Sequence, residues 1–231
     1  PLNLYKGYCT QKSRTCQVHQ INNEKIQELF LNIHNLPVLK TNNLFGQDHN
    51  NKIKNLILDY EKNNPVGMES NVKAWSSSYQ THKETDVFSE YLSCISGFSQ
   101  NIYNNMFSVN QELSLSDFWV SHYKKGDYTK KHNHGSSFNG NVISGCYYVH
   151  VEEGASPIIF EGEEPIYPEN DTLIIFSSYL YHEVPPTDAE RIVMSFNLIQ
   201  NNIPSFNSDH IKNIENILRN EQDLSSVENM L

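Results

Sequence analysis

The second half of the chain carries a series of short β-forming segments, and this pattern restricts the fold more than any other feature. After Leu113, short runs of β-branched and aromatic residues alternate with Gly, Pro, Asn and Asp. Several strands of this length and spacing are typical of a β-sandwich or jelly roll. The predicted strands cover residues 115–123, 142–151, 157–161, 172–176 and 191–199.

The first half has the apolar spacing of amphipathic helices, which predicts helices over 24–34, 48–60 and 85–107. Thr85 or Asp86 is expected to cap the last of these helices, and an extended segment is expected near 73–79. Helical spacing returns at 209–218, in a tail that packs on the barrel or mediates self-association as a homodimer. We therefore predict one domain, with a helical N-terminal extension (1–112), a β core (113–200) and a C-terminal helical tail (201–231).

The composition excludes some function classes. The net charge is −10 and the pI is about 5.4, so the surface repels phosphate backbones and nucleic acid is not expected as a partner. We see no signal peptide and no apolar run long enough to span a bilayer. The four cysteines show no paired C-x-x-C spacing. The expectation is a cytoplasmic protein without membrane contact.

Three histidines and one arginine are candidates for chemistry. His132 and His134 are two residues apart, and on a strand this spacing points both imidazoles to one face, as a shared metal requires. Histidines that cluster by chance in a polar turn are the alternative. His182 follows an apolar strand further along, and Arg191 opens the next strand. A buried arginine there needs a carboxylate partner, whereas an exposed strand edge would give only a surface ion pair.

The order of these residues resembles that of the 2-oxoglutarate/Fe(II) dioxygenases, especially the prolyl-4-hydroxylase-like branch. It is also similar to a group of small 2-oxoglutarate oxygenases of unknown substrate. The likeness covers roughly residues 70–200. The segments that carry it are 74–77, 126–128, 132–134, 144–149, 175–178 with His182, and 191–197.

The resemblance implies a double-stranded β-helix (a cupin-like jelly roll) of the α+β class, with a mainly β core, N-terminal buttressing helices and a C-terminal helix. It also implies that His132 and His182 bind iron and that Arg191 holds the distal carboxylate of 2-oxoglutarate. Tyr148 matches a tyrosine that reaches the same carboxylate, although a core aromatic residue is an equal interpretation. The remaining cosubstrate candidates are Tyr123, which matches a tyrosine lining that pocket, and Asn197, which shares the strand face of Arg191.

One position departs from the family pattern. The superfamily usually has a carboxylate two residues after the first histidine, and this chain has His134 there. Three arrangements follow: a three-histidine site, a two-histidine site with an open position, or recruitment of Asp127 or Glu183. Glu183 alternates away from His182 on a strand, so we predict the metal ligands to be His132, His134 and His182.

The implied cofactors are Fe(II), 2-oxoglutarate and O2. The implied reaction is hydroxylation of a C–H bond in a peptide, an amino acid or a small metabolite, with succinate and CO2 as co-products. Two alternatives stay open. One is a three-histidine cupin-type dioxygenase that does not use 2-oxoglutarate, and the other is a non-catalytic jelly-roll binding protein.

Overall fold

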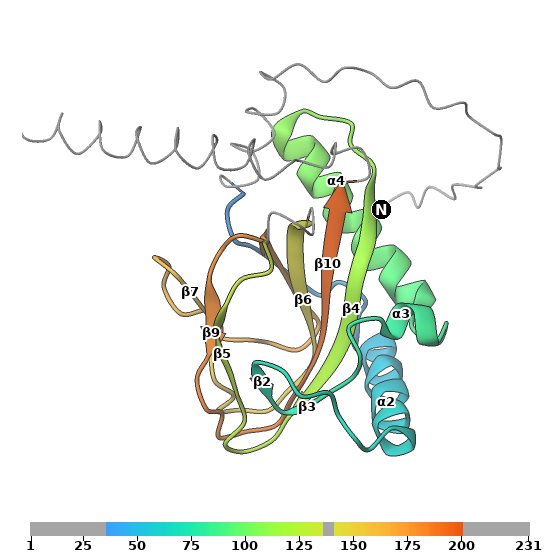
Figure 1. The fold of residues 1–231 in the computed structure, drawn as a ribbon, viewed down its shortest axis with the longest axis vertical. Coiled ribbons are helices and arrows are strands. Elements are labelled where there is room, and N and C mark those ends of the chain that lie inside the picture. Colours follow the sequence, from blue (N-terminus) through green and yellow to red (C-terminus); the bar gives the residue numbers. More distant parts are fainter. Residues whose placement is uncertain (1–35, 136–140, 201–231) are drawn as a thin grey trace, which may run out of the picture.

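The computed structural model describes residues 36–135 and 141–200. Two antiparallel sheets face each other, and helices cover the outer face of the larger sheet (Figure 1). Within the described residues, no helix has both the length and the apolar character needed to cross a membrane. The elements are β1 (Leu39–Asn42), α2 (Gln47–Asn63), β2 (Val72–Lys73), β3 (Trp75–Ser76), α3 (Thr81–Glu84), α4 (Ser89–Phe107), β4 (Leu113–Tyr123), β5 (Tyr128–His132), β6 (Asn141–Val151), β7 (Ile159–Phe160), β8 (Thr172–Ser177), β9 (His182–Val184) and β10 (Arg191–Gln200).

The topology confirms the predicted double-stranded β-helix. The six-stranded sheet has the order β1-β8-β6-β10-β4-β3, and the four-stranded sheet has the order β2-β5-β9-β7. The five predicted strands appear as β4, β6, β7, β8 and β10, and the predicted extended segment supplies β2 and β3. The strands β1, β5 and β9 were not predicted.

The large sheet is buried on both faces, so its alternating residues feed two separate cores. On β10, Ile192, Met194 and Phe196 belong to the core beneath the helices. Val193 belongs to the second core, which lies between the two sheets. Because strand side chains alternate between faces, every second residue of β10 points into the interior of the barrel.

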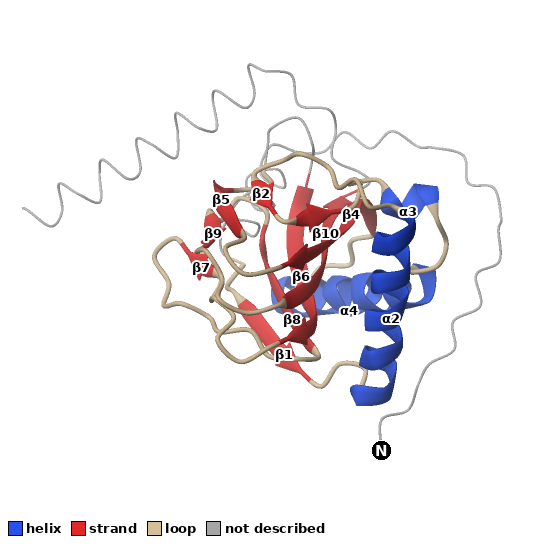
Figure 2. Ribbon diagram, turned by 90° about the horizontal axis from the view of Figure 1, so that it is seen from below, coloured by secondary structure: helices blue, strands red, loops and turns tan. Residues whose placement is uncertain are grey.

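The helices α2 and α4 lie on the same side of the large sheet and run in different directions (Figure 2). The helix α2 confirms the prediction over 48–60. The prediction for α4 was wrong at its start: the helix begins at Ser89, and its N-cap Phe88 makes no side-chain capping bond. Phe88 is fully buried, and this anchor in the core sets the start of the helix in place of a polar cap. The predicted helices at 24–34 and 209–218 lie outside the described residues.

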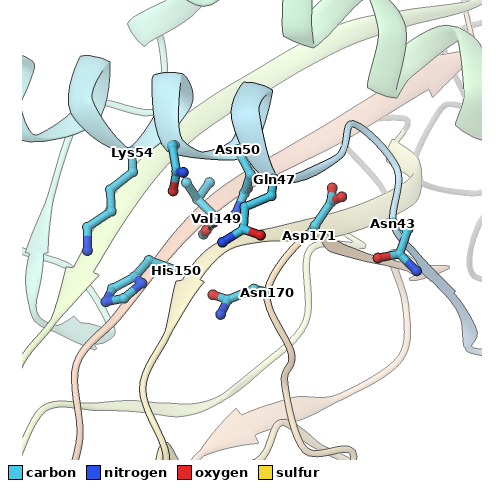
Figure 3. A pocket seen from close by; sticks show the side chains of 9 residues that line it. Asn43, Gln47, Asn50, Lys54, Val149, His150, Asn170 and Asp171 are labelled. Atoms are coloured by element: carbon cyan, nitrogen blue, oxygen red, sulfur yellow. Dashed lines mark hydrogen bonds between the residues drawn. The ribbon is translucent and has the colours of Figure 1, made fainter.

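Buried polar contacts hold α2 on the sheet at the hollow of Figure 3. The Tyr147 hydroxyl lies 2.7 Å from both Asn50 Oδ1 and Asp171 Oδ1, and Asn50 Nδ2 donates to the carbonyl of Val149. Asp171 also accepts from the backbone N–H groups that precede α2. Asn50, Tyr147, Val149 and Asp171 thus form a hydrogen-bonded joint beneath the hollow. This joint between α2 and the large sheet positions the helix.

Candidate active site

The three histidines meet at the junction between β5 and β9 in the small sheet. His132 ends β5 and pairs directly with His182, which begins β9. His134 follows two residues later, and its backbone N–H donates to the carbonyl of Ser178 at 2.8 Å. The ligand atoms of the three side chains all lie within 4.8 Å of one another. The folded chain therefore brings together the three residues that the sequence predicted as metal ligands.

Backbone carbonyls set the orientation of two of these rings. The Nδ1 atom of His132 lies 2.8 Å from the Lys130 carbonyl, and that of His182 lies 3.1 Å from the Leu180 carbonyl. A carbonyl only accepts, so each Nδ1 carries the proton and each Nε2 keeps its lone pair. This is the arrangement that fixes the tautomer of metal-binding histidines. The His134 ring packs against Trp119, with ring centroids 5.6 Å apart.

Burial holds all three imidazoles in the neutral form. Burial and, to a smaller extent, the neighbouring His132 lower the pKa of His182 to about 4. The pKa of His134 lies well below its ordinary value because the ring is buried and faces the other two histidines. Burial also lowers the pKa of His132. Neutral imidazole is the form that binds a metal, so the donors are ready near neutral pH.

The donor set fits a divalent first-row metal. Imidazole nitrogen suits iron, copper, nickel and zinc, whereas structural zinc sites normally have four ligands and often use cysteine. Three histidines leave coordination positions open to other molecules. The group contains neither Asp127 nor Glu183, and Asp127 instead accepts from the backbone N–H of Lys124.

Arg191 lies in the interior and is only partly paired. Its side chain is 1% exposed. One guanidinium nitrogen donates to the Ser156 carbonyl at 3.1 Å, and the guanidinium carbon lies 4.1 Å from the centre of the Tyr123 ring. Its Nε is buried without a hydrogen-bond partner, and no ion pair of the described residues includes it. A buried cation without a counter-ion is costly, so this guanidinium offers a site for an anion.

Both predicted cosubstrate tyrosines lie beside the arginine. Tyr123 pairs with Arg191 across β4 and β10, and its hydroxyl lies 2.6 Å from the hydroxyl of Thr129. Tyr148 is 2% exposed, and burial raises its pKa well above the ordinary value, so its hydroxyl stays a hydrogen-bond donor. These residues and the three histidines line one cavity with apolar walls, which include Ile158, Phe176, Val184 and Val193.

Asn197 lines a second hollow, which shares Trp119, His132 and His134 with the first cavity. Its side chain accepts from Ser144 at 2.7 Å and donates to Asp117 at 3.1 Å. It does not line the cavity that holds Arg191. Its predicted contact with 2-oxoglutarate stays a prediction.

Four further residues of the site were not predicted. Asp117 and Trp119 share a strand face with Tyr123, so the alternation of the predicted strand 115–123 carried the signal for both. Thr129 lies on β5, which was not predicted as a strand. Ser156 acts through its backbone carbonyl, for which the side-chain pattern gives no signal.

The sequence matches no protein-family model and no curated protein. The structure, however, is similar to those of solved oxygenases. It matches the viral collagen prolyl hydroxylase of Paramecium Bursaria Chlorella virus-1 in its 2-oxoglutarate complex with a TM-score of 0.55, at 15% identity, over 70% of this chain and 94% of that one. It matches a prolyl hydroxylase of Trichoplax adhaerens, solved with a hypoxia inducible factor peptide, with a TM-score of 0.58, at 15% identity, over 78% and 94%.

The similarity extends beyond prolyl hydroxylases. The non-heme alpha ketoglutarate dependent epimerase SnoN, from nogalamycin biosynthesis, matches with a TM-score of 0.56, at 11% identity, over 81% of this chain and 88% of that one. The fold is thus the double-stranded β-helix of the 2-oxoglutarate/Fe(II) oxygenases. Because an epimerase shares this fold with hydroxylases, the fold does not define the reaction.

Proposed function

We propose that this protein is an Fe(II)- and 2-oxoglutarate-dependent oxygenase. The observation that carries the proposal is the set of side chains that line one cavity. Three neutral imidazoles and a buried guanidinium line it, and the guanidinium has no ion-pair partner among the described residues. A molecule with a metal-binding group at one end and a carboxylate at the other would satisfy both, and 2-oxoglutarate has this chemistry.

Each residue of the cavity then has a distinct task. His132, His134 and His182 would hold the iron through nitrogen. Arg191 would bind the distal carboxylate through charge-assisted hydrogen bonds. The Ser156 carbonyl and the Tyr123 ring hold the guanidinium in place. Tyr148 would donate its hydroxyl to the same carboxylate.

When bound, iron would supply the oxidation by O2, with one oxygen atom entering a substrate C–H bond as hydroxyl and the other entering succinate as 2-oxoglutarate loses CO2. The chain itself positions the reactants and excludes water. The apolar side chains between the histidines and Arg191 line the wall of the cavity and strengthen the electrostatic contacts within it. We propose hydroxylation of a small molecule or peptide as the outcome.

The test is an anaerobic titration of Fe(II) into the metal-free protein in the presence of 2-oxoglutarate. Chelation of ferrous iron by a keto acid gives a weak visible charge-transfer band. The band is expected in the native protein, absent in His182→Ala and weakened in Arg191→Ala. His49→Ala is the matched control, because His49 is exposed and lines neither the cavity nor the second hollow.

Two other outcomes would replace the proposal. Iron binding without the band would favour a three-histidine dioxygenase that does not use 2-oxoglutarate. A protein that binds no iron would instead be a jelly-roll binding module, and the histidine cluster would then be structural.

A further inference from the structure

The second hollow lies on the other side of the histidines from Arg191, and its chemistry differs. We call it the outer hollow. It adjoins His132 and His134, and its walls include Tyr79, Asp117 and Trp119. Among the described residues that line it, Asp117 is the one carboxylate, and no lysine or arginine is present. If the histidines hold the metal, a molecule in this hollow lies next to the reacting centre.

The negative charge of Asp117 is held in place but not neutralised. Gln80 donates to Oδ1 at 3.0 Å, and Asn197 and the Ser116 hydroxyl donate to Oδ2 at 3.1 and 2.7 Å; all three donors are neutral. No ion pair of the described residues includes Asp117. His82 lies within the electrostatic reach of Asp117, but burial lowers the pKa of His82 and favours its neutral form. The carboxylate therefore lacks a cationic partner from the described part of the chain.

Two aromatic rings accompany this carboxylate. Tyr79 and Trp119 pack edge to face, with ring centroids 5.0 Å apart. Trp119 also contacts the His134 ring. Aromatic faces attract cations, and a carboxylate beside them adds a direct charge interaction.

The strand register orders these groups along the barrel. On β4, Asp117, Trp119 and Tyr123 lie on one face, and they pair with Asn197, Ser195 and Arg191 of β10. Arg191 and Asp117 therefore lie six or more residues apart along these strands, and neither has an ion-pair partner among the described residues. His132 and His134 line both the cavity of Arg191 and the outer hollow of Asp117. Asp117 lies two residues beyond Trp119, about 7 Å along the strand.

We propose that the substrate carries a cationic nitrogen, an amine or a guanidinium, which binds Asp117 in the outer hollow beside the packed rings of Tyr79 and Trp119. The carbon to be oxidised would then lie a few bonds from this nitrogen, beside the histidines. This inference rests on the proposed function, because it takes the histidines as the reacting centre. The opposite charges of Arg191 and Asp117 would also direct the anionic cosubstrate and the cationic substrate to separate sites.

The test measures binding to the full chain with three capped amino acids as probes. Nα-acetyl-lysine N-methylamide carries an ammonium group, Nα-acetyl-norleucine N-methylamide is a neutral analogue of similar length, and Nα-acetyl-glutamate N-methylamide is anionic. Binding to the metal-free protein is followed by the fluorescence of Trp119 in a Trp75→Phe background, since the chain has two tryptophans. Binding to the anaerobic Fe(II) and 2-oxoglutarate complex is followed by the change in the visible band.

We expect the lysine probe to bind at least ~10-fold more tightly than the norleucine probe, as for a hydrogen bond to a charged group. The glutamate probe should bind most weakly. In Asp117→Asn the preference for the cation should disappear. If this variant does not fold, the comparison of the three probes on the native chain still decides the question.

Equal affinities for the lysine and norleucine probes, with the visible band present, would overturn the cation site and leave the oxygenase proposal standing. Absence of the band would overturn the oxygenase proposal, and the inference about its substrate would fail with it. A visible band together with tighter binding of the lysine probe, and loss of that tighter binding in Asp117→Asn, would support the cationic substrate.

Discussion

His134 is the residue at which this chain departs from the oxygenases it resembles. A carboxylate at this position would cancel one unit of the metal charge, whereas neutral imidazole cancels none. The two other histidines pair directly across β5 and β9, while His134 lies beyond β5 and is held by the Ser178 carbonyl. The distinction between a two-histidine and a three-histidine site therefore depends on this one side chain.

Substitution of His134 separates the two cases. If His134 binds the metal, His134→Ala should weaken Fe(II) binding by ~100-fold, the equivalent of about 3 kcal/mol for a lost ligand. His134→Asp supplies the carboxylate of a two-histidine, one-carboxylate iron site and should retain most of the affinity. Calorimetric titration of both variants measures this. Unchanged affinity in His134→Ala would show a two-histidine site.

Under the proposed function Arg191 binds the cosubstrate, and its burial also has a cost in stability. Its buried charge has one hydrogen bond to a backbone carbonyl and no counter-ion among the described residues. Replacing buried ionic groups by apolar residues of similar volume is often stabilising. Arg191→Met should raise the free energy of unfolding of the ligand-free protein by ~1–3 kcal/mol and abolish binding of 2-oxoglutarate.

Urea unfolding of the ligand-free native protein and of Arg191→Met gives the difference in stability, and the visible band gives the loss of binding. Arg191→Lys is the control, since it keeps the charge but not the planar fork of donors. It should show no gain in stability. A destabilised Arg191→Met would indicate that the arginine serves mainly to support the fold.

At the scale of elements, the sequence predicted those strands and helices that bury apolar side chains in a regular pattern. The strands β4, β6, β8 and β10 are rich in β-branched and aromatic residues, and the helix α2 shows a clear apolar stripe. The strand β5 was missed because its sequence, Tyr-Thr-Lys-Lys-His, is polar; it pairs with β2 and β9 in the small sheet. The strand β9 has only three residues.

The site, too, has residues that the sequence pattern predicted and contacts that it did not. The histidines and Arg191 were predicted because charged and metal-binding residues at strand ends are conspicuous in a sequence. The contact between Arg191 and the Ser156 carbonyl depends on a loop conformation, which residue type does not encode. Asn197 and Arg191 line different hollows, and the sequence could not predict this because a shared strand face does not say how far along the strand a cavity extends.

The joint between α2 and the large sheet gives a prediction at this scale. Asn50 is buried and contacts Val149 and Tyr147, whereas its neighbour Asn51 is exposed. Asn50→Ala should lower the free energy of unfolding by about 1–3 kcal/mol, because it leaves a buried carbonyl without its donor. Asn51→Ala should change it by less than about 0.5 kcal/mol.

Denaturant unfolding of both variants measures this effect, and metal titration provides the functional control. The joint lies on the outer face of the large sheet (Figure 3). Metal affinity should therefore be the same in both variants. A loss of metal affinity in Asn50→Ala would show that the helix is coupled to the histidines through the sheet.

At the scale of the whole molecule, folding and ligand binding are linked through the same interior. The ligand-free fold buries the incompletely paired Arg191 and holds the half-buried carboxylate of Asp117 without an ion-pair partner among the described residues. A metal and a dicarboxylate that bind the folded chain would remove part of this cost. Any ligand that binds the folded state alone stabilises it in proportion to the logarithm of its concentration.

This linkage predicts that metal and 2-oxoglutarate stabilise the protein together more than the sum of their separate effects. Arg191 alone offers 2-oxoglutarate one carboxylate contact, and the metal offers the second contact at the other end of the molecule. With a redox-inert divalent metal in place of iron, 2-oxoglutarate at 100 times its Kd should add about 2.7 kcal/mol to the free energy of unfolding. Thermal unfolding with and without a chelator measures how far the stabilisation by 2-oxoglutarate depends on the metal.

Glutarate is the control, because it has both carboxylates but no keto group, and it should add much less. If 2-oxoglutarate gave the same shift with the metal removed, its binding would depend on Arg191 without the histidines, and the two ends of the cavity would act as separate sites.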